Sequence, residues 1–211
     1  MPYLLEVCTE TPDGAAAAAR GGASRIELCS RLDLGGLTPD GETLRATSAA
    51  VELPVFAMVR PRGGDFVARP GEVDALERDL LECLEAGADG LVLGLLTADR
   101  RPDTDFLERL LASAGKQVPI TFHRAFDSVA DRHEALEVLI ELGFSRLLTT
   151  GGPERAWDGR DILAGLVEQA AGRLVVMPGG GVRSDHADEL ARLTGAAELH
   201  GSVPFHPGGV R

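Results

Sequence analysis

The sequence predicts an α/β fold, a TIM-like (β/α)8 barrel of parallel strands in a single domain over residues 1–211. Short apolar β-like runs alternate with helical stretches, with almost no linker between them. Several helical stretches end at a glycine followed by the next apolar run, as in EAGADGLVLG and ELGFSRLLTT. Eight β/α units favour a parallel sheet, and eight strands favour its closure into a barrel. An open doubly wound sheet is the alternative.

The elements follow this alternation in order along the chain. The expected strands are residues 3–8, 25–29, 55–60, 90–93, 118–123, 146–149, 174–177 and 198–200. The expected helices are residues 11–20, 41–50, 72–86, 104–114, 132–142, 162–170 and 184–193. After the last strand only SVPFHPGGVR remains, which is too short and too rich in Pro and Gly for an eighth helix. A second copy of the chain, in a homo-oligomer, could cover the flank left open, or the tail could lie along it.

Composition excludes several classes of protein. The formal net charge of −12 disfavours nucleic-acid binding. No apolar run approaches the roughly 18 residues that span a membrane, so no membrane partner is expected. The start MPYLLEVC lacks a basic region and a cleavable apolar segment, so we expect a cytoplasmic protein. Its three cysteines are expected to be thiols.

Three expected strands carry the same pattern, a glutamate followed two residues later by cysteine or histidine. Residues two apart in a strand point to the same face, and in a closed barrel the eighth, first and second strands are neighbours. Carboxylates avoid the apolar helical layer, so these pairs should line the lumen and end at the C-terminal mouth, where barrel active sites are built. The pairs are Glu6 with Cys8, Glu27 with Cys29, and Glu198 with His200. Alternatively, the cysteines are small buried hydrophobes and the glutamates pair with Arg25 or other lumen arginines.

The facing wall is expected to be basic. Arg60 and Arg62 follow the third strand in RPRGGDF, and two guanidinium groups at a barrel mouth can clamp a carboxylate or phosphate. Alternatively, they pair with Glu27 or Asp65. His123 ends the fifth strand and could be a general base, a metal ligand or a hydrogen-bond donor.

Further candidates for anion binding lie beside or after the late strands. Arg124 follows His123, with Asp127 nearby. Glycine-rich loops after late barrel strands often bind phosphate through backbone N–H groups, although tight turns also need glycine. The expected anion- or substrate-binding residues outside the third strand are Arg124, Gly151, Gly152, Gly179, Gly180, Gly181 and Ser202.

Together these segments resemble the CutC family. The matching motifs are LLEVC, RIELC, GGLTP, RPRGGDF, TFHRAFD, LLTTGG, MPGGGVR and ELHGS, which run from residue 4 to residue 202. The resemblance implies a TIM-barrel-like fold and a link to copper homeostasis. Thr9 departs from the family pattern, in which many members have a second cysteine at this position.

Two functions remain open at this point. The first is Cu(I) binding through Cys8, Cys29 and His200, because Cu(I) prefers thiolates and imidazoles. The second is an enzyme acting on a small phosphate- or carboxylate-bearing metabolite, with Glu6, Glu27 and His123 moving protons. Lys116 precedes the fifth strand at the wrong end of a barrel, so Schiff-base chemistry is not expected. A divalent metal held by the glutamates and a histidine is a third alternative.

Overall fold

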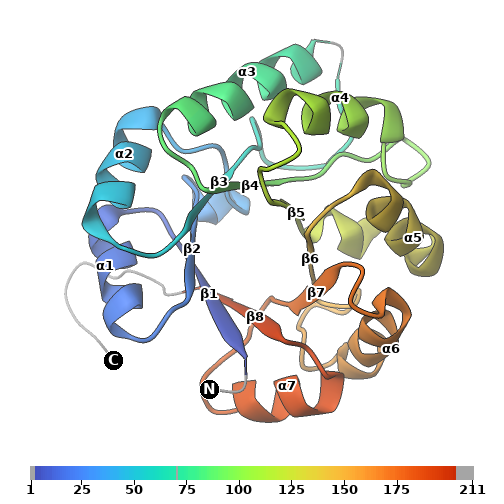
Figure 1. Ribbon diagram of the computed structural model, residues 1–211. Helices are drawn as coiled ribbons and strands as arrows, with labels where there is room; N and C mark the ends of the chain where they lie inside the picture. The colour runs from blue at the N-terminus through green and yellow to red at the C-terminus, as the bar shows by residue number, and fades with distance from the viewer. Residues whose placement is uncertain (1–2, 70, 203–211) are drawn as a thin grey trace.

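The computed structural model describes residues 3–69 and 71–202 and forms a parallel β-barrel ringed by helices (Figure 1). The eight strands hydrogen-bond in the order β7-β6-β5-β4-β3-β2-β1-β8. A parallel bridge between Gly179 and His200 joins the two ends of this sheet. The predicted barrel is therefore confirmed, and the open doubly wound sheet is not the fold.

The elements alternate as the sequence predicts. The strands are β1 (Leu4–Thr9), β2 (Arg25–Leu28), β3 (Val55–Met58), β4 (Gly90–Leu93), β5 (Ile120–Phe122), β6 (Arg146–Thr149), β7 (Val175–Pro178) and β8 (Glu198–Ser202). The helices are α1 (Pro12–Arg20), α2 (Gly41–Ala50), α3 (Glu72–Glu85), α4 (Thr104–Ala114), α5 (Arg132–Leu142), α6 (Arg160–Ala170) and α7 (Ala187–Thr194). Two short 3-10 helices, η1 (Leu32–Leu34) and η2 (Arg124–Ser128), follow β2 and β5.

Local chemistry explains where several helices begin and end. The side chains of Thr11, Asp40 and Asp131 accept hydrogen bonds from backbone N–H groups in the first turns of α1, α2 and α5. Helices α5 and α7 end at Gly143 and Gly195, which have φ of 87° and 70°. These signals are local in sequence, so the predicted helix boundaries agree with the observed ones within two residues, except that α7 begins at Ala187 rather than at residue 184.

The largest difference between predicted and observed strands is at β5. The sequence predicts a strand over residues 118–123, but β5 covers only Ile120–Phe122. His123 leaves the strand and its side chain accepts the N–H of Ala125, which starts η2. The predicted loop after this strand is therefore an ordered helical turn.

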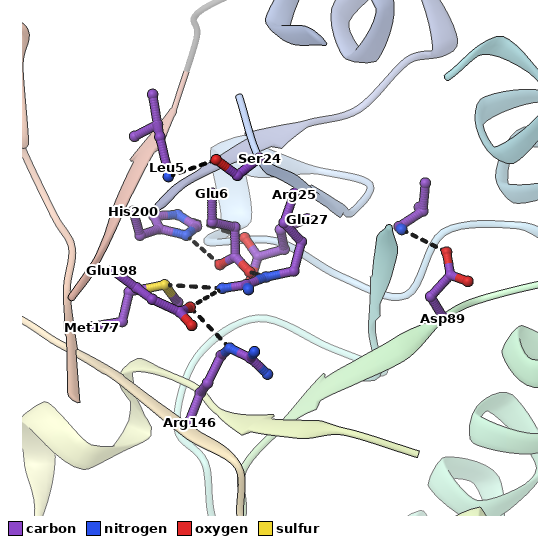
Figure 2. Close-up of polar contacts among 11 residues, drawn as sticks. Leu5, Glu6, Ser24, Arg25, Glu27, Asp89, Arg146, Met177, Glu198 and His200 are labelled. Carbon is purple, nitrogen blue, oxygen red and sulfur yellow. Dashed lines mark hydrogen bonds and ion pairs between the residues drawn. The ribbon is translucent and has the colours of Figure 1, made fainter. Parts of the chain in front are cut away.

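The strands separate an apolar outer layer from a polar interior. Ile26 and Leu199 are fully buried among the apolar residues between strands and helices. Glu6 and Glu27 are also buried, but they face the lumen and one another across neighbouring strands (Figure 2). The predicted inward direction of the glutamates is confirmed.

Figure 1 shows α7 and α1 on either side of the wall formed by β8 and β1. The predicted short tail that follows Ser202 lies outside the described residues, so its effect on this flank stays a prediction. No helix among the described residues is long and apolar enough to cross a bilayer.

Candidate functional site

Glu6 is the centre of a buried polar cluster formed by β8, β1 and β2. It lies in register with Arg25 on β2 and with His200 on β8. Arg25 Nε donates to Glu6 Oε2 at 2.5 Å, and His200 Nδ1 lies 2.8 Å from Glu6 Oε1 (Figure 2). Burial by itself would raise the pKa of Glu6, but the hydrogen bond and charge of His200 and the charge of Arg25 lower it to about 2. Glu6 is therefore an ionised carboxylate whose two oxygens are both engaged.

A second carboxylate completes the floor of the barrel. Arg25 Nη2 donates to Glu198 Oε2 at 2.5 Å, and Arg146 Nε on β6 donates to the same oxygen at 2.9 Å. Both guanidinium groups also lie over the ring of Phe56, at 5.0 and 5.4 Å from its centroid. The expected pairing of glutamates with lumen arginines is thus confirmed for Glu6 and Glu198. Arg146 was not singled out from sequence, although a charged residue inside an apolar strand was a usable signal.

Two thiols lie next to this floor. Cys8 and Cys29 are buried, and their Sγ atoms are 3.3 Å apart. The hydrogen bond with Cys29 raises the pKa of the Cys8 thiol well above its usual value, and burial and the nearby Glu27 add to this effect. Cys8 is therefore protonated at neutral pH when no metal is bound.

Cys8, Glu27 and His200 form a group of potential metal ligands. One donor atom from each lies within 4.8 Å of the others. His200 Nε2 is 3.7 Å from Glu27 Oε2, and Glu27 Oε1 is buried with no hydrogen-bond partner among the described residues. Burial raises the pKa of Glu27, although the charge of His200 acts against this. For His200, burial would lower the pKa, but the charges of Glu27 and Glu6 raise it.

This donor set fits a metal ion. Because His200 Nδ1 is held by Glu6, its Nε2 is the nitrogen that faces Glu27, as in the carboxylate–histidine pairs of metal sites. The Cys8 thiolate and the His200 imidazole are soft ligands that suit Cu(I), and Cys29 Sγ lies 3.3 Å from Cys8 Sγ. The free oxygen of Glu27 is a harder ligand, and a group of thiolate, imidazole and carboxylate donors also suits Zn²⁺.

A cavity of about 280 Å³ opens at the C-terminal mouth of the barrel, beside these ligands. The structure brings many of the predicted site residues to it and adds six apolar or small residues that were not singled out. The predicted residues in the lining are Cys8, Glu27, Arg60, His123, Arg124, Gly180, Gly181, His200 and Ser202. The additional ones are Leu32, Gly35, Met58, Phe66, Leu148 and Gly201. Glu6 lies outside the lining, held in the polar floor.

The two arginines of the predicted clamp have different partners. Arg62 lies outside the cavity lining, with its Nε 2.6 Å from Glu72 Oε1 and its Nη2 2.8 Å from Asp65 Oδ1. Arg60 lines the cavity and is buried. Arg60 and Arg62 both line a smaller neighbouring pocket, so their joint role in anion binding stays a prediction.

His123 faces the cavity in a defined protonation state. Its Nδ1 accepts the backbone N–H of Ala125 at 3.2 Å, so the ring proton of the neutral imidazole is on Nε2. Burial lowers the pKa of His123 to about 3, and the charge of Arg60 adds to this. Of the three roles open from sequence, this geometry favours a neutral hydrogen-bond donor over a general base.

The glycines of the loops after β6 and β7 differ in their position relative to the cavity. Gly180 and Gly181 line the cavity, whereas Gly151 and Gly152 lie outside its lining. Gly179 sits where β7 approaches β8, and a Cβ there would lie 2.4 Å from Leu148 Cδ1 and 3.0 Å from His200 Cβ. Glycine at 179 therefore allows the close approach that positions His200.

Comparison with known proteins identifies the family. Residues 3–204 match the model of the CutC family. A human protein named copper homeostasis protein cutC homolog is 45% identical over 201 residues, which are 95% of this chain and 73% of the relative. A CutC family protein of Caulobacter vibrioides (strain NA1000 / CB15N) is 48% identical over 199 residues, 94% of this chain and 80% of the relative.

Solved structures agree on the fold. A crystal structure of CutC from Streptococcus agalactiae superposes with a TM-score of 0.89 at 33% identity, covering 94% of this chain and 97% of that one. A phosphonopyruvate hydrolase structure reaches a TM-score of 0.67 at 15% identity, covering 94% of this chain and 75% of that one, and shows the shared barrel alone. The family model, the relatives at 45–48% identity and the superposed barrel agree, and the chain belongs to the CutC family.

Proposed function

We propose that this protein binds Cu(I) at Cys8, Cys29 and His200, in keeping with the copper homeostasis named for its relatives. The observation that carries the proposal is the pair of thiols 3.3 Å apart beside an imidazole whose other nitrogen is held by Glu6. Because the site needs reduced thiols, the proposal places the protein in a reducing compartment such as the cytoplasm.

Binding at this site releases protons. The raised pKa of Cys8 means that the thiol must lose its proton when the metal binds. The affinity for Cu(I) should therefore rise with pH, by about tenfold per pH unit for each proton released. Within the site, Arg25 and Arg146 balance the charges of Glu6 and Glu198 and so keep the floor in place when the thiolates form.

A divalent ion is the second candidate, favoured by the free oxygen of Glu27. In that case Glu27 joins the thiolates and His200 as a ligand, and Zn²⁺ competes with Cu(I). Replacing Glu27 distinguishes Zn²⁺ binding from Cu(I) binding. The Glu27→Gln variant should keep its Cu(I) affinity, whereas it should lose Zn²⁺ affinity if the carboxylate is a ligand.

The experiment is an anaerobic competition titration of the reduced protein against a chromogenic Cu(I) chelator at several pH values. We expect one Cu(I) per chain, affinity that rises with pH, and loss of binding in the Cys8→Ser, Cys29→Ser double variant. Cys83→Ser is the matched control, because Cys83 is a buried thiol in α3 away from the cavity lining. X-ray absorption should show sulfur and nitrogen neighbours of copper. Unchanged affinity in the double variant would remove these thiols from the site.

A further inference from the structure

We infer that the cavity at the barrel mouth also binds a small organic monocarboxylate with a compact apolar body, on the wall formed by Arg60, His123 and Arg124. This wall faces the metal ligands and has no place in the Cu(I) proposal. Three observations support it: an uncompensated buried charge, an unpartnered donor, and an apolar lining.

The uncompensated charge is that of Arg60. The residue is buried, with 9% of its surface exposed. Its terminal nitrogens donate only to backbone carbonyls, those of Leu34 at 3.4 Å, Gly35 at 3.1 Å and Gly64 at 2.9 Å. Among the described residues no carboxylate lies within ion-pair distance of it, and its Nε has no partner. A buried cation without a counter-charge is costly, so an anion bound nearby would offset that cost.

The other arginines around the barrel show why Arg60 stands apart. Arg25 and Arg146 pair with Glu6 and Glu198 in the floor. Arg62, outside the lining, pairs with Glu72 and Asp65. Among the described residues Arg60 is therefore the guanidinium of the cavity wall that has no carboxylate within ion-pair distance, which favours an anion beside it.

The unpartnered donor is His123 Nε2. The imidazole is 4% exposed, and its Nδ1 is occupied by the Ala125 N–H. Nε2 makes no hydrogen bond to a described residue, and it is not among the polar atoms sealed by protein. Since His123 lines the cavity, this N–H is available to an oxygen of a bound ligand.

Arg124 stands at the rim of the same wall. Its Nε donates to Asp127 Oδ2 at 2.9 Å, and its terminal nitrogens donate to none of the described groups. A Cβ at Gly180 would lie 3.5 Å from Arg124 Cζ, so the guanidinium lies against the bare backbone of the loop after β7. Arg124 can therefore add a second donor to a ligand oxygen while Asp127 balances its charge.

The rest of the lining determines the body of the ligand. Leu32, Met58, Phe66 and Leu148 supply apolar surface. The ring of Phe66 lies 4.7 Å from the Arg60 guanidinium and 5.1 Å from the His123 ring, so it holds both donors in place. The cavity of about 280 Å³ is small beside the ~300–1,000 Å³ of sites for drug-sized ligands, so the apolar body must be compact. The Glu27 carboxylate in the same lining disfavours a dianion such as phosphate, so the ligand should carry a single negative charge.

The test uses the metal-free, reduced protein and follows the melting temperature with added sodium benzoate or isobutyrate. Sodium chloride at equal ionic strength and benzamide, the uncharged counterpart of benzoate, are the controls. We expect at least one of the two carboxylates to raise the melting temperature by about 3–5 °C at ten times its Kd. Benzamide and inorganic phosphate should raise it by less than about 1 °C at the same concentration. Both estimates use a shift of ~2–4 °C in melting temperature per kcal/mol of stabilisation.

Variants show whether the stabilisation comes from binding at the wall of Arg60, His123 and Arg124 or from a general effect of the salt on the protein. Arg60→Met should weaken carboxylate binding at least about tenfold, and Arg60→Gln, which also removes the charge but keeps hydrogen-bond donors, provides the test if the methionine variant does not fold. His123→Phe should weaken it similarly. Arg62→Gln is the matched control and should bind as the wild type does.

Four results would overturn the inference. They are an absence of stabilisation by either carboxylate, equal stabilisation by benzamide, stronger stabilisation by phosphate, and unchanged affinity in both Arg60 variants. Copper is absent from these measurements, so their failure leaves the Cu(I) proposal standing, and failure of Cu(I) binding leaves the carboxylate site standing.

Discussion

Arg25 is the residue on which the buried floor of the barrel depends most, and replacing it with methionine tests that view. Arg25 bridges Glu6 and Glu198 at 2.5 Å to each, and its side chain is 7% exposed. Removing one partner of a buried ion pair costs about 3–5 kcal/mol, because it leaves a buried charge without compensation. Each carboxylate keeps one other partner, so we expect the lower end, about 3 kcal/mol.

The assay is urea unfolding of wild type and Arg25→Met at pH 7, followed by circular dichroism. In thermal unfolding of a chain of this size, a loss of about 3 kcal/mol in unfolding free energy corresponds to a melting temperature lower by about 6–12 °C. The matched control is Arg173→Met, which breaks the solvent-exposed ion pair with Glu137 and should destabilise far less than Arg25→Met, because water screens exposed charges.

The pH dependence of this loss gives a second readout. In the wild type the pKa of Glu6 lies at about 2, below its unfolded value of 4.5, so its contribution to stability is full above pH 4.5 and is lost as the pH falls towards 2. Without Arg25 the pKa of Glu6 is lowered less. The difference in unfolding free energy between wild type and Arg25→Met should therefore shrink as the pH falls from 4.5 towards 2. Equal costs for Arg25→Met and Arg173→Met at pH 7 would refute the reasoning.

Two further predictions concern acid stability and a glycine of the cavity wall. The pKa of His123 is about 3 in the folded protein against 6.5 unfolded, so the unfolded chain binds more protons between these values and stability falls as the pH drops from 6.5 towards 3. His123→Gln should show a flatter pH profile of unfolding free energy over this range, and a profile parallel to the wild type would contradict the assignment. Gly180 has φ of 97° and a Cβ there would lie 2.6 Å from Thr150 Cγ2, so Gly180→Ala should destabilise by more than about 1 kcal/mol in urea unfolding. Gly165→Ala, in α6 with no atom within 4 Å of the added Cβ, should instead stabilise by about 0.5–1 kcal/mol, and equal effects of the two substitutions would contradict this account.

The sequence by itself determined the barrel and the inward direction of its polar pairs. Strand alternation, helix caps and glycine stops act within a few residues, so they can be recognised from local order. Period-two alternation put Glu6, Glu27 and His200 on one face, and the closure of eight strands made their three strands neighbours. The proximity of Cys8 and Cys29 followed from the same two facts.

Only the tertiary structure decided how the charged groups are shared among partners. Arg60 and Arg62 look equivalent in RPRGGDF, yet Arg62 finds Glu72 at the start of α3 while Arg60 turns to the cavity. His123 likewise could act as a base from its position alone, and the N–H of Ala125 assigned its proton to Nε2. The physical reason is that hydrogen bonds and charge compensation depend on distances of a few ångströms between segments remote in sequence, and burial then determines which protonation state persists.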